Sequence, residues 1–437
     1  MKYSHNEDQK SLFSFGLMNI DIPKDHELVK MEREIDWEAM VEIVEKKYSG
    51  KTGRNSKSLR MMMGLEIAKR KYGLSDKAIV EQLAVDMALK IFCGFDEWEH
   101  DLLEASSMTR FRERLDKKTL QQLEEVNLRK MIRKVPRRNR YQVITDSTCV
   151  EANVTYPTDS KLLSKVYEKL VQSAKKIREE GAELVIRGKL KMKKAVRFFN
   201  LKRRKTRKEI LKMNKKLIRE SQKVTNLIKE NLYVAKKEAK DKIVNILKIT
   251  KTILSQQNQM IQSKTRCIKD RIVSFHETKV RPIFRGKEGK QTEFGPKVAI
   301  NIIGGALAQT TKLSNDNFSD TEMVSASLKT NQSTFGRDPT ELIADRGAHS
   351  PKNHQILSNK KIMDGIQYRG KIPQKANLPP PRTGKRMYKQ RSTVEGKIGI
   401  LKTHYGGNRN KYKNEHAQCL LSFGFIAMNA TWVAART

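Results

Sequence analysis

Four side chains near the end of the chain have types and spacing that suit phosphate and metal chemistry. They are Tyr388, Arg391, Glu395 and Lys402. On a helix, at about 100° per residue, all four point within an arc of about 60°. A carboxylate beside two cations and a phenol hydroxyl suits a surface that binds phosphates and holds a metal ion. The spacing therefore predicts a helix with such a site along one edge.

Two more carboxylates stand where strands are expected, far from Glu395 in the sequence. Asp146 lies within residues 141–150, whose β-branched side chains predict a strand, and Asp345 follows a predicted short strand at 340–344. If these strands are neighbours and the helix of Glu395 crosses them, the three carboxylates converge. Converging carboxylates repel each other unless a cation neutralises them. Mg²⁺ fits, because it prefers oxygen ligands, and two ions about 4 Å apart serve phosphodiester displacement.

Each acid alone has a more ordinary interpretation. An Asp after a strand is more often a turn or helix cap, and a Glu on a basic helix is usually an ion-pair partner. Asp159 remains an alternative to Asp146, because 199 residues (345 − 146) separate Asp146 from Asp345. His349 and His354 are expected to lie on a helix face or contact phosphate, since a hard ion prefers oxygen.

The N-terminal part of the chain predicts short helices that end at glycine turns. Ser58, Ser75 and Ser107 are the expected capping residues, because a serine hydroxyl before an apolar run accepts from the first free amides. Such helices form either a DNA-contacting unit similar to a helix-turn-helix or a dimerisation or packing domain. The sequence leaves both interpretations open.

The net charge of +40, with a pI near 10, predicts a polyanionic partner. Residues 161–270 predict a basic helical block with a Lys-Arg-Arg-Lys run at 202–205, either a nucleic-acid arm or a solvated helical hairpin. The four cysteines lack paired spacing, which disfavours zinc knuckles and a disulfide framework and fits a reducing compartment. The apolar stretch 419–435 is broken by polar residues and predicts a buried core helix, so no membrane partner is expected.

Without the basic block, the predicted order is strand, hairpin of strands, helix, strand, helix, strand, helix. The hairpin is expected to join 280–284 to 292–309, with 304–305 as a further turn or bulge, and the last strand is 365–368. Antiparallel strands followed by parallel ones joined by helices give a mixed sheet covered by helices, the order of an RNase H-like domain. We therefore expect a mixed α/β fold with three parts: an N-terminal all-helical domain (1–135), an RNase H-like catalytic core (136–160 and 271–437) and a basic helical insertion (161–270).

The spacing Tyr-(2)-Arg-(3)-Glu-(6)-Lys resembles the signature of bacterial insertion-sequence transposases of the DDE class, in the group typified by families four and five. Residues 145–148 (Thr-Asp-Ser-Thr) and 343–347 (Ile-Ala-Asp-Arg-Gly) are similar to the segments that carry that family's first and second Asp. The resemblance implies that Asp146, Asp345 and Glu395 bind two catalytic Mg²⁺ ions, for which Mn²⁺ substitutes. It also implies that Tyr388, Arg391 and Lys402 contact backbone phosphates near the cleaved DNA end.

For the whole protein, the resemblance implies a cytoplasmic, nucleoid-associated bacterial enzyme that acts on double-stranded DNA. It would bind the terminal inverted repeats of its own element, cleave the DNA ends and join the 3′-hydroxyl to target DNA, as a homodimer on DNA. A nuclease of the same fold that does not join strands is one alternative. A DNA-binding protein that has lost catalysis is the other.

Overall fold

The computed structural model divides the chain into two compact units. The larger contains Met1–Asn153 and Ile283–Thr437, and the smaller contains Val154–Pro282. The structure describes residues 23–49, 56–94, 103–265, 267–287, 290–370, 372, 379–410 and 416–436. Each unit has its own hydrophobic core, so each is described by itself.

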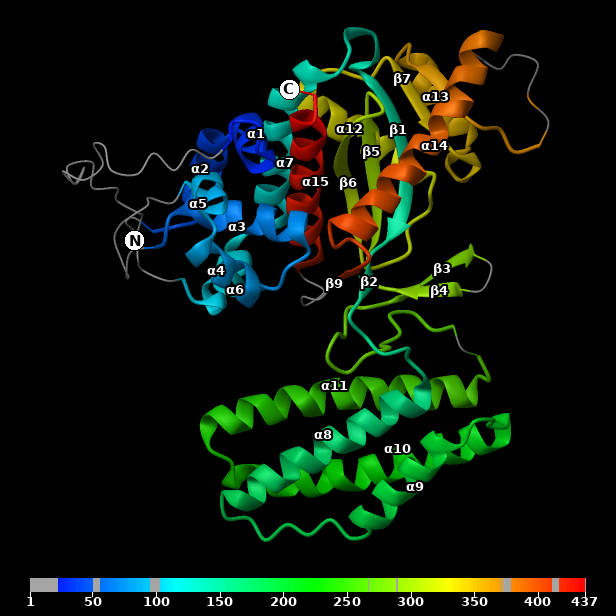
Figure 1. The fold of residues 1–437 in the computed structure, drawn as a ribbon. Helices are drawn as coiled ribbons and strands as arrows, with labels where there is room; N and C mark the ends of the chain where they lie inside the picture. Colours follow the sequence, from blue (N-terminus) through cyan, green and yellow to red (C-terminus); the bar gives the residue numbers. More distant parts are fainter. Residues whose placement is uncertain are drawn as a thin grey trace, which may run out of the picture. The chain divides into compact units, whose positions relative to one another are not determined.

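A five-stranded mixed sheet forms the centre of the larger unit (Figure 1), in the order β6-β5-β1-β7-β8. The strands β1, β5 and β6 are antiparallel neighbours, whereas β7 and β8 continue the sheet in parallel with β1. Their bounds are β1 (Gln142–Cys149), β5 (Lys297–Ile303), β6 (Leu307–Ser314), β7 (Glu341–Ala344) and β8 (Met363–Ile366). The predicted mixed α/β fold is confirmed, as is the prediction that the strands before Asp345 and around Asp146 are neighbours.

The predicted hairpin is confirmed in part. The strands β3 (Pro282–Lys287) and β4 (Lys290–Phe294) are paired, but they form a separate two-stranded sheet, because the run expected to continue from 292 is interrupted at 295–296 before β5 begins. The predicted turn at 304–305 is confirmed: it separates β5 from β6, and the φ angles of Gly304 and Gly305 are 60° and 71°. Glycine takes this left-handed conformation without steric cost, so the pair forms the turn that reverses the chain.

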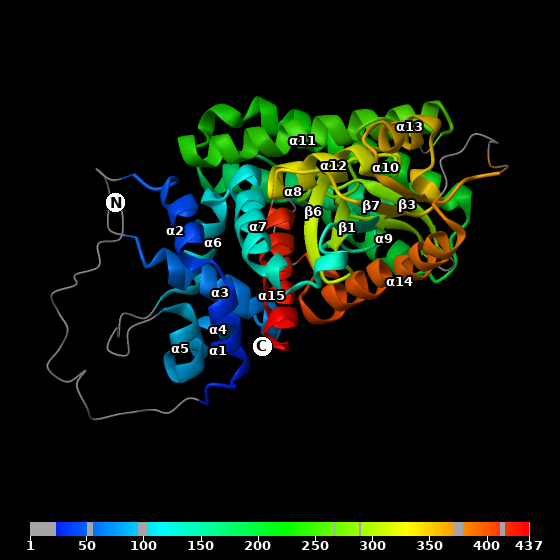
Figure 2. The same cartoon turned by 90° about the horizontal axis from the view of Figure 1, so that it is seen from above.

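Helices cover both faces of the central sheet. Figure 2 shows α12 and α14 on opposite sides of it. The helices after β6 are α12 (Glu322–Phe335), α13 (Pro351–Asn359), α14 (Pro381–His404) and α15 (Ala417–Ala434). The sequence predicted α13 correctly, because the Ser350 hydroxyl caps it and Pro351 occupies its first turn.

The N-terminal segment folds into seven α-helices within the described residues. They are α1 (Glu27–Glu34), α2 (Trp37–Glu45), α3 (Leu59–Tyr72), α4 (Asp76–Val85), α5 (Met87–Cys93), α6 (Ala105–Arg114) and α7 (Lys117–Met131). The predicted caps Ser58 and Ser75 are confirmed, since each side chain accepts from the amide three residues on. The predicted cap Ser107 is wrong: it lies inside α6, which begins after Glu104 without a capping side chain.

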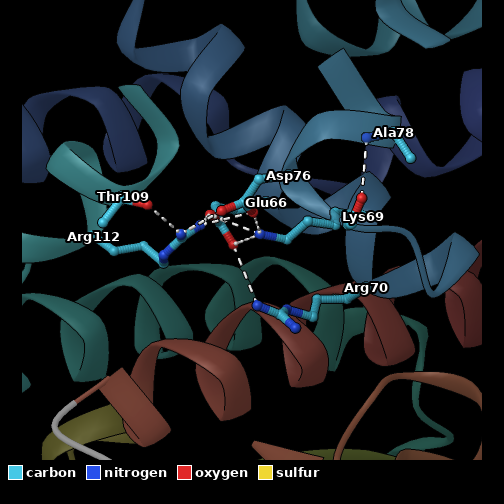
Figure 3. A network of polar contacts seen from close by, with 8 residues as sticks. Glu66, Lys69, Arg70, Asp76, Ala78, Thr109 and Arg112 are labelled. Atoms are coloured by element: carbon cyan, nitrogen blue, oxygen red, sulfur yellow. Dashed lines mark hydrogen bonds and ion pairs between the residues drawn. The ribbon is translucent and has the colours of Figure 1, made fainter. Parts of the chain in front are cut away.

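A buried network of charged side chains joins α3, α4 and α6 (Figure 3). Glu66 is fully buried and pairs with Arg112 at 2.5 Å and with Lys69 at 3.1 Å. Asp76, the first residue of α4, pairs with the same two cations. Burial alone would raise the pKa of Glu66, but Lys69, Arg70 and Arg112 hold it below its usual value. The carboxylate is therefore charged near neutral pH, and it holds the three helices together.

The open edge of the sheet, strand β6, is covered by side chains from α15 and α7. Asn429 donates to the carbonyl of Ala308 and accepts from its amide, both at 2.8 Å. Glu124 accepts from the amide of Thr310 at 2.7 Å. An uncovered edge would present unpaired backbone groups, so these contacts complete the sheet. Among the described residues, α15 alone is long and apolar enough to cross a membrane; 89% of it is buried, which agrees with the predicted core helix.

The smaller unit is a set of helices packed on one apolar core. Its helices are α8 (Asp159–Glu179), α9 (Lys189–Leu201), α10 (Arg207–Glu230) and α11 (Lys237–Gln262). A capping box of Thr206 and Glu209 opens α10. Residues 154–282 contain 36 Lys and Arg against 12 Asp and Glu, so this unit carries +24 of the chain's +40.

Candidate active site

Asp146 and Asp345 occupy matching positions on two neighbouring strands, Asp146 inside β1 and Asp345 directly after β7. The last paired positions of β1 and β7 are Ile144 and Ile343, and both strands run in the same direction. Two residues further along each strand stand Asp146 and Asp345. Residues two apart on a strand point to the same face, so the two carboxylates share the face of Ile144 and Ile343.

That face is the one covered by α14. A Cβ on Gly365 would lie 2.6 Å from the Met387 side chain of α14 and 3.0 Å from that of Ile343, so Ile343 points toward this helix. Ser147, the residue after Asp146, points the other way, because its hydroxyl donates to Asp320 just before α12. The two aspartates therefore face the helix that carries Glu395.

Both carboxylates are held by a backbone amide. Asp146 Oδ1 accepts from the amide of Ser147 at 2.6 Å. Asp345 Oδ1 accepts from the amide of Gly347 at 2.8 Å and so caps the 3₁₀ turn Arg346–Ala348. An amide that donates to a carboxylate oxygen fixes the orientation of that carboxylate. Each of the two oxygens therefore has a fixed direction.

Asp320 is a residue of this region that the sequence analysis missed. Its Oδ1 accepts from the Ser147 hydroxyl at 2.9 Å and pairs with Lys297 Nζ of β5 at 2.8 Å. A Cβ on Gly347 would lie 2.8 Å from Asp320 Oδ2 and 2.9 Å from Asp345 Oδ1, so a side chain there would displace one of these carboxylates. Asp320 thereby joins the strand of Asp146 to the turn of Asp345. In the sequence it is one acid before a helix, which gives no signal of this role.

The predicted helix is confirmed: Tyr388, Arg391, Glu395 and Lys402 all lie on α14. The buried side of α14 is formed by Met387, Val394 and Leu401. At about 100° per residue, the four polar residues lie about 90° around the helix from that buried side. They therefore lie along the edge of the face by which α14 packs on the sheet.

The Glu395 side chain lies beside Arg391 and does not point toward the two aspartates. Its side chain is 62% exposed and lies 3.7 Å from Arg391, one helical turn away. In the described part of the chain, no three His, Cys, Asp or Glu side chains stand close enough to hold a metal ion. However, α14 packs on β1, β7 and β8, and an exposed side chain in a surface ion pair is free to rotate. The all-oxygen donor set of two aligned aspartates and one mobile glutamate fits Mg²⁺.

The alternative acid, Asp159, is engaged elsewhere. It stands in the first turn of α8 in the smaller unit, where its carboxylate pairs with Arg271 at 2.8 Å and accepts from Gln257 at 2.9 Å. These contacts favour Asp146 as the first acid. His354 lies on α13, which agrees with the helix-face position expected of it, and it hydrogen-bonds with Asp364 and His349 and stacks on Tyr368. His349 lies before that helix, at the end of the 3₁₀ turn.

Comparisons with known proteins give the family of the chain. Residues 18–114 match the family described as a transposase domain (DUF772). Residues 167–430, more than half of the chain, match the family described as a transposase DDE domain. This second match contains Asp345 and Glu395, whereas Asp146 precedes it.

One curated relative is an uncharacterized protein, ORF8 in the nfe locus of Rhizobium meliloti. It is 32% identical over 135 residues, which cover 30% of this chain and 64% of that protein. No solved structure matches the chain. The predicted resemblance to transposases of the DDE class is confirmed by the two family matches: this chain belongs to the DDE-domain transposases of insertion sequences.

Proposed function

We propose that this protein binds the terminal inverted repeats of its own insertion sequence, cleaves the DNA ends and joins the 3′-hydroxyl to target DNA. The observation that carries the proposal is the alignment of Asp146 with Asp345 on the sheet face under α14. The strand order β6-β5-β1-β7-β8 supports an RNase H-like core for residues 136–160 and 271–437. The helices before this core and the basic insertion are the proposed DNA-binding and dimerisation parts.

In this mechanism Asp146 of β1 and Asp345 after β7 would hold the divalent ions, and Glu395 would turn away from Arg391 to join them. Bound divalent ions activate the attacking oxygen and stabilise the leaving one. The rotation of Glu395 also releases the Arg391 guanidinium, whose planar fork suits a phosphate. Tyr388, 64% exposed on the same margin of α14, donates its hydroxyl to a neighbouring phosphate, and Lys402 adds a point charge.

A strand-transfer assay tests this function. The substrate is a labelled duplex that ends in the element's terminal repeat with a free 3′-hydroxyl, mixed with a supercoiled target plasmid and Mg²⁺. We expect label covalently joined to the plasmid, since a transposase transfers the 3′-oxygen to a target phosphorus. Cleavage of an uncut repeat without any joined product would instead indicate a nuclease. A band shift with neither product would indicate a DNA-binding protein without catalysis.

A second prediction concerns Asp320, which we propose as a positioning residue for the two aspartates. Replacing Asp320 by Ala removes the bridge from Lys297 to Ser147. Groups that orient metal ligands typically change metal affinity by about 10–100-fold. We therefore expect Asp320→Ala to weaken Mn²⁺ binding, followed by the free Mn²⁺ signal in electron paramagnetic resonance, by roughly tenfold.

The matched control is Asp338→Ala, which removes an aspartate that pairs with Lys360 at 2.7 Å in the same unit. We expect this control to bind Mn²⁺ as the wild type does. A general loss of packing would lower the melting temperature of Asp320→Ala without changing its Mn²⁺ affinity. That result would contradict the positioning role.

A further inference from the structure

Helix α9 of the smaller unit has apolar side chains on two opposite sides. Met192 is buried and Val196 packs against the core of the unit. Leu190, Phe198 and Leu201 are instead 73%, 72% and 71% exposed. These three lie within an arc of about 80°, roughly opposite Met192. Single exposed apolar residues are ordinary, but three together on one helix face indicate an interaction surface.

The surroundings of this face are strongly basic, although Glu209, near the start of α10, pairs with Lys202 of the turn. Residues 184–208, which include α9 and the turn at 202–205, contain 12 Lys and Arg and no Asp or Glu. Lys194 falls on the same arc as Leu190 and Phe198, and Arg197 lies about 20° beyond its edge. The turn that follows α9 is exposed at Lys202, Arg203 and Arg204.

We propose that this face, Leu190 to Leu201 with the turn 202–205, binds duplex DNA, with Phe198 and Leu201 in a groove and the cations on the flanking phosphates. A second copy of the chain is disfavoured, because pairing this face with itself would bring two sets of 12 cations together. A polyanion matches the charge, and apolar side chains that enter a DNA groove are used by many DNA-bending proteins. The inference rests on the proposed function only for its partner, DNA.

Salt dependence separates the two kinds of contact. Each phosphate contact contributes about −0.9 to the slope of log K against log salt, whereas an apolar contact contributes nothing to it. The probe is a fluorescent duplex of about 40 base pairs, titrated with the full chain by anisotropy, without metal, from about 50 to 200 mM salt. Leaving out the metal makes the measurement independent of Asp146, Asp345 and Glu395.

We expect the combined variant Lys202→Ala, Arg203→Ala, Arg204→Ala and Lys205→Ala to reduce the magnitude of the slope by roughly 2–4. The double variant Phe198→Ser and Leu201→Ser should weaken binding about tenfold at every salt concentration with an unchanged slope, whereas Phe198→Leu should keep most of the affinity. Tyr233→Ser is the matched control, because Tyr233 is 79% exposed in the same unit and lies outside the cation run. It should bind as the wild type does.

Several outcomes would overturn this inference. Wild-type DNA affinity in the double variant would show that the apolar face does not touch DNA. A loss of self-association in sedimentation, with DNA affinity kept, would assign the face to a second copy. A loss of binding to anionic lipid vesicles, with DNA affinity kept, would assign it to a membrane surface. If Asp345→Asn still cleaved DNA, the proposed active site would fail while the α9 inference remained standing.

Discussion

Replacing Asp345 or Asp146 by Asn is expected to lower the rate of DNA cleavage by about 10³-fold or more. Each substitution removes one charged ligand from a site whose ions stabilise the charge that develops at the phosphorus. A loss of about 4 kcal/mol of transition-state stabilisation corresponds to this factor. The measurement is the single-turnover cleavage rate of a terminal-repeat duplex in Mg²⁺. Glu395→Gln should behave in the same way.

The same variants are expected to keep their fold. Asp146 and Asp345 are aligned on adjacent parallel strands, where two carboxylates repel each other. Removing one charge relieves that repulsion, so the melting temperature without metal should stay the same or rise. DNA binding in the absence of metal should also be unchanged. A variant that lost cleavage and melting temperature together would indicate a structural role and contradict the assignment.

Replacing Glu124 by Gln is expected to stabilise the protein at alkaline pH. Burial raises the pKa of Glu124 from 4.5 to about 7, although the Ser422 hydroxyl and the Thr310 amide donate to its carboxyl group. At 1.36 kcal/mol per pKa unit, the shift corresponds to about 3 kcal/mol. Gln keeps an oxygen for the amide of Thr310 and offers an NH₂ group to the Ser422 oxygen, without a charge to bury.

The direction of the pH dependence follows from the raised pKa. Below about pH 4.5 the carboxyl is protonated in the folded and the unfolded protein, and its contribution to stability is fully present. As the pH rises through about 7, the folded state must bury the charge, and this contribution is lost. The free energy of unfolding is measured in urea for both proteins. The value for Glu124→Gln minus the value for the wild type should therefore rise by about 3 kcal/mol from pH 4.5 to pH 8.

The control for this experiment is Glu38→Gln, an exposed glutamate in the first turn of α2. Its free energy of unfolding should differ little from that of the wild type at both pH values, because a solvated carboxylate has no burial cost. A Glu124→Gln variant that was equally destabilised at both pH values would show that Gln cannot replace the two hydrogen bonds. The account of a buried, partly protonated Glu124 would then be wrong.

Local patterns predicted the parts of the fold that depend on neighbouring residues. The stripe on α14 followed from helical periodicity, and the caps Ser58 and Ser75 from their own sequence neighbourhood. The turn between β5 and β6 was predicted from Gly304 and Gly305, whereas the break between β4 and β5 at 295–296 was missed. The separation of 199 positions between Asp146 and Asp345 has a structural explanation, since a separate helical unit, residues 154–282, is inserted after β1.

Long-range contacts could not be predicted in the same way. The bridge from Lys297 through Asp320 to Ser147 joins three segments that only the sheet brings together. The cover of the β6 edge by Glu124 and Asn429 likewise depends on how two distant helices pack. Neither has a sequence signal, because an isolated Asp, Glu or Asn has many possible partners. The register of β1 with β7, which aligns the two catalytic candidates, became visible only in the structure.

The most direct test of the metal site is cleavage by Asp345→Cys in Mg²⁺ and in Mn²⁺. Mg²⁺ binds oxygen ligands and accepts a thiolate poorly, whereas the softer Mn²⁺ accepts it more readily. If Asp345 is a metal ligand, the variant should be inactive in Mg²⁺ and regain cleavage in Mn²⁺, while the wild type is active in both. Cleavage at the wild-type rate in Mg²⁺ would contradict the proposed site.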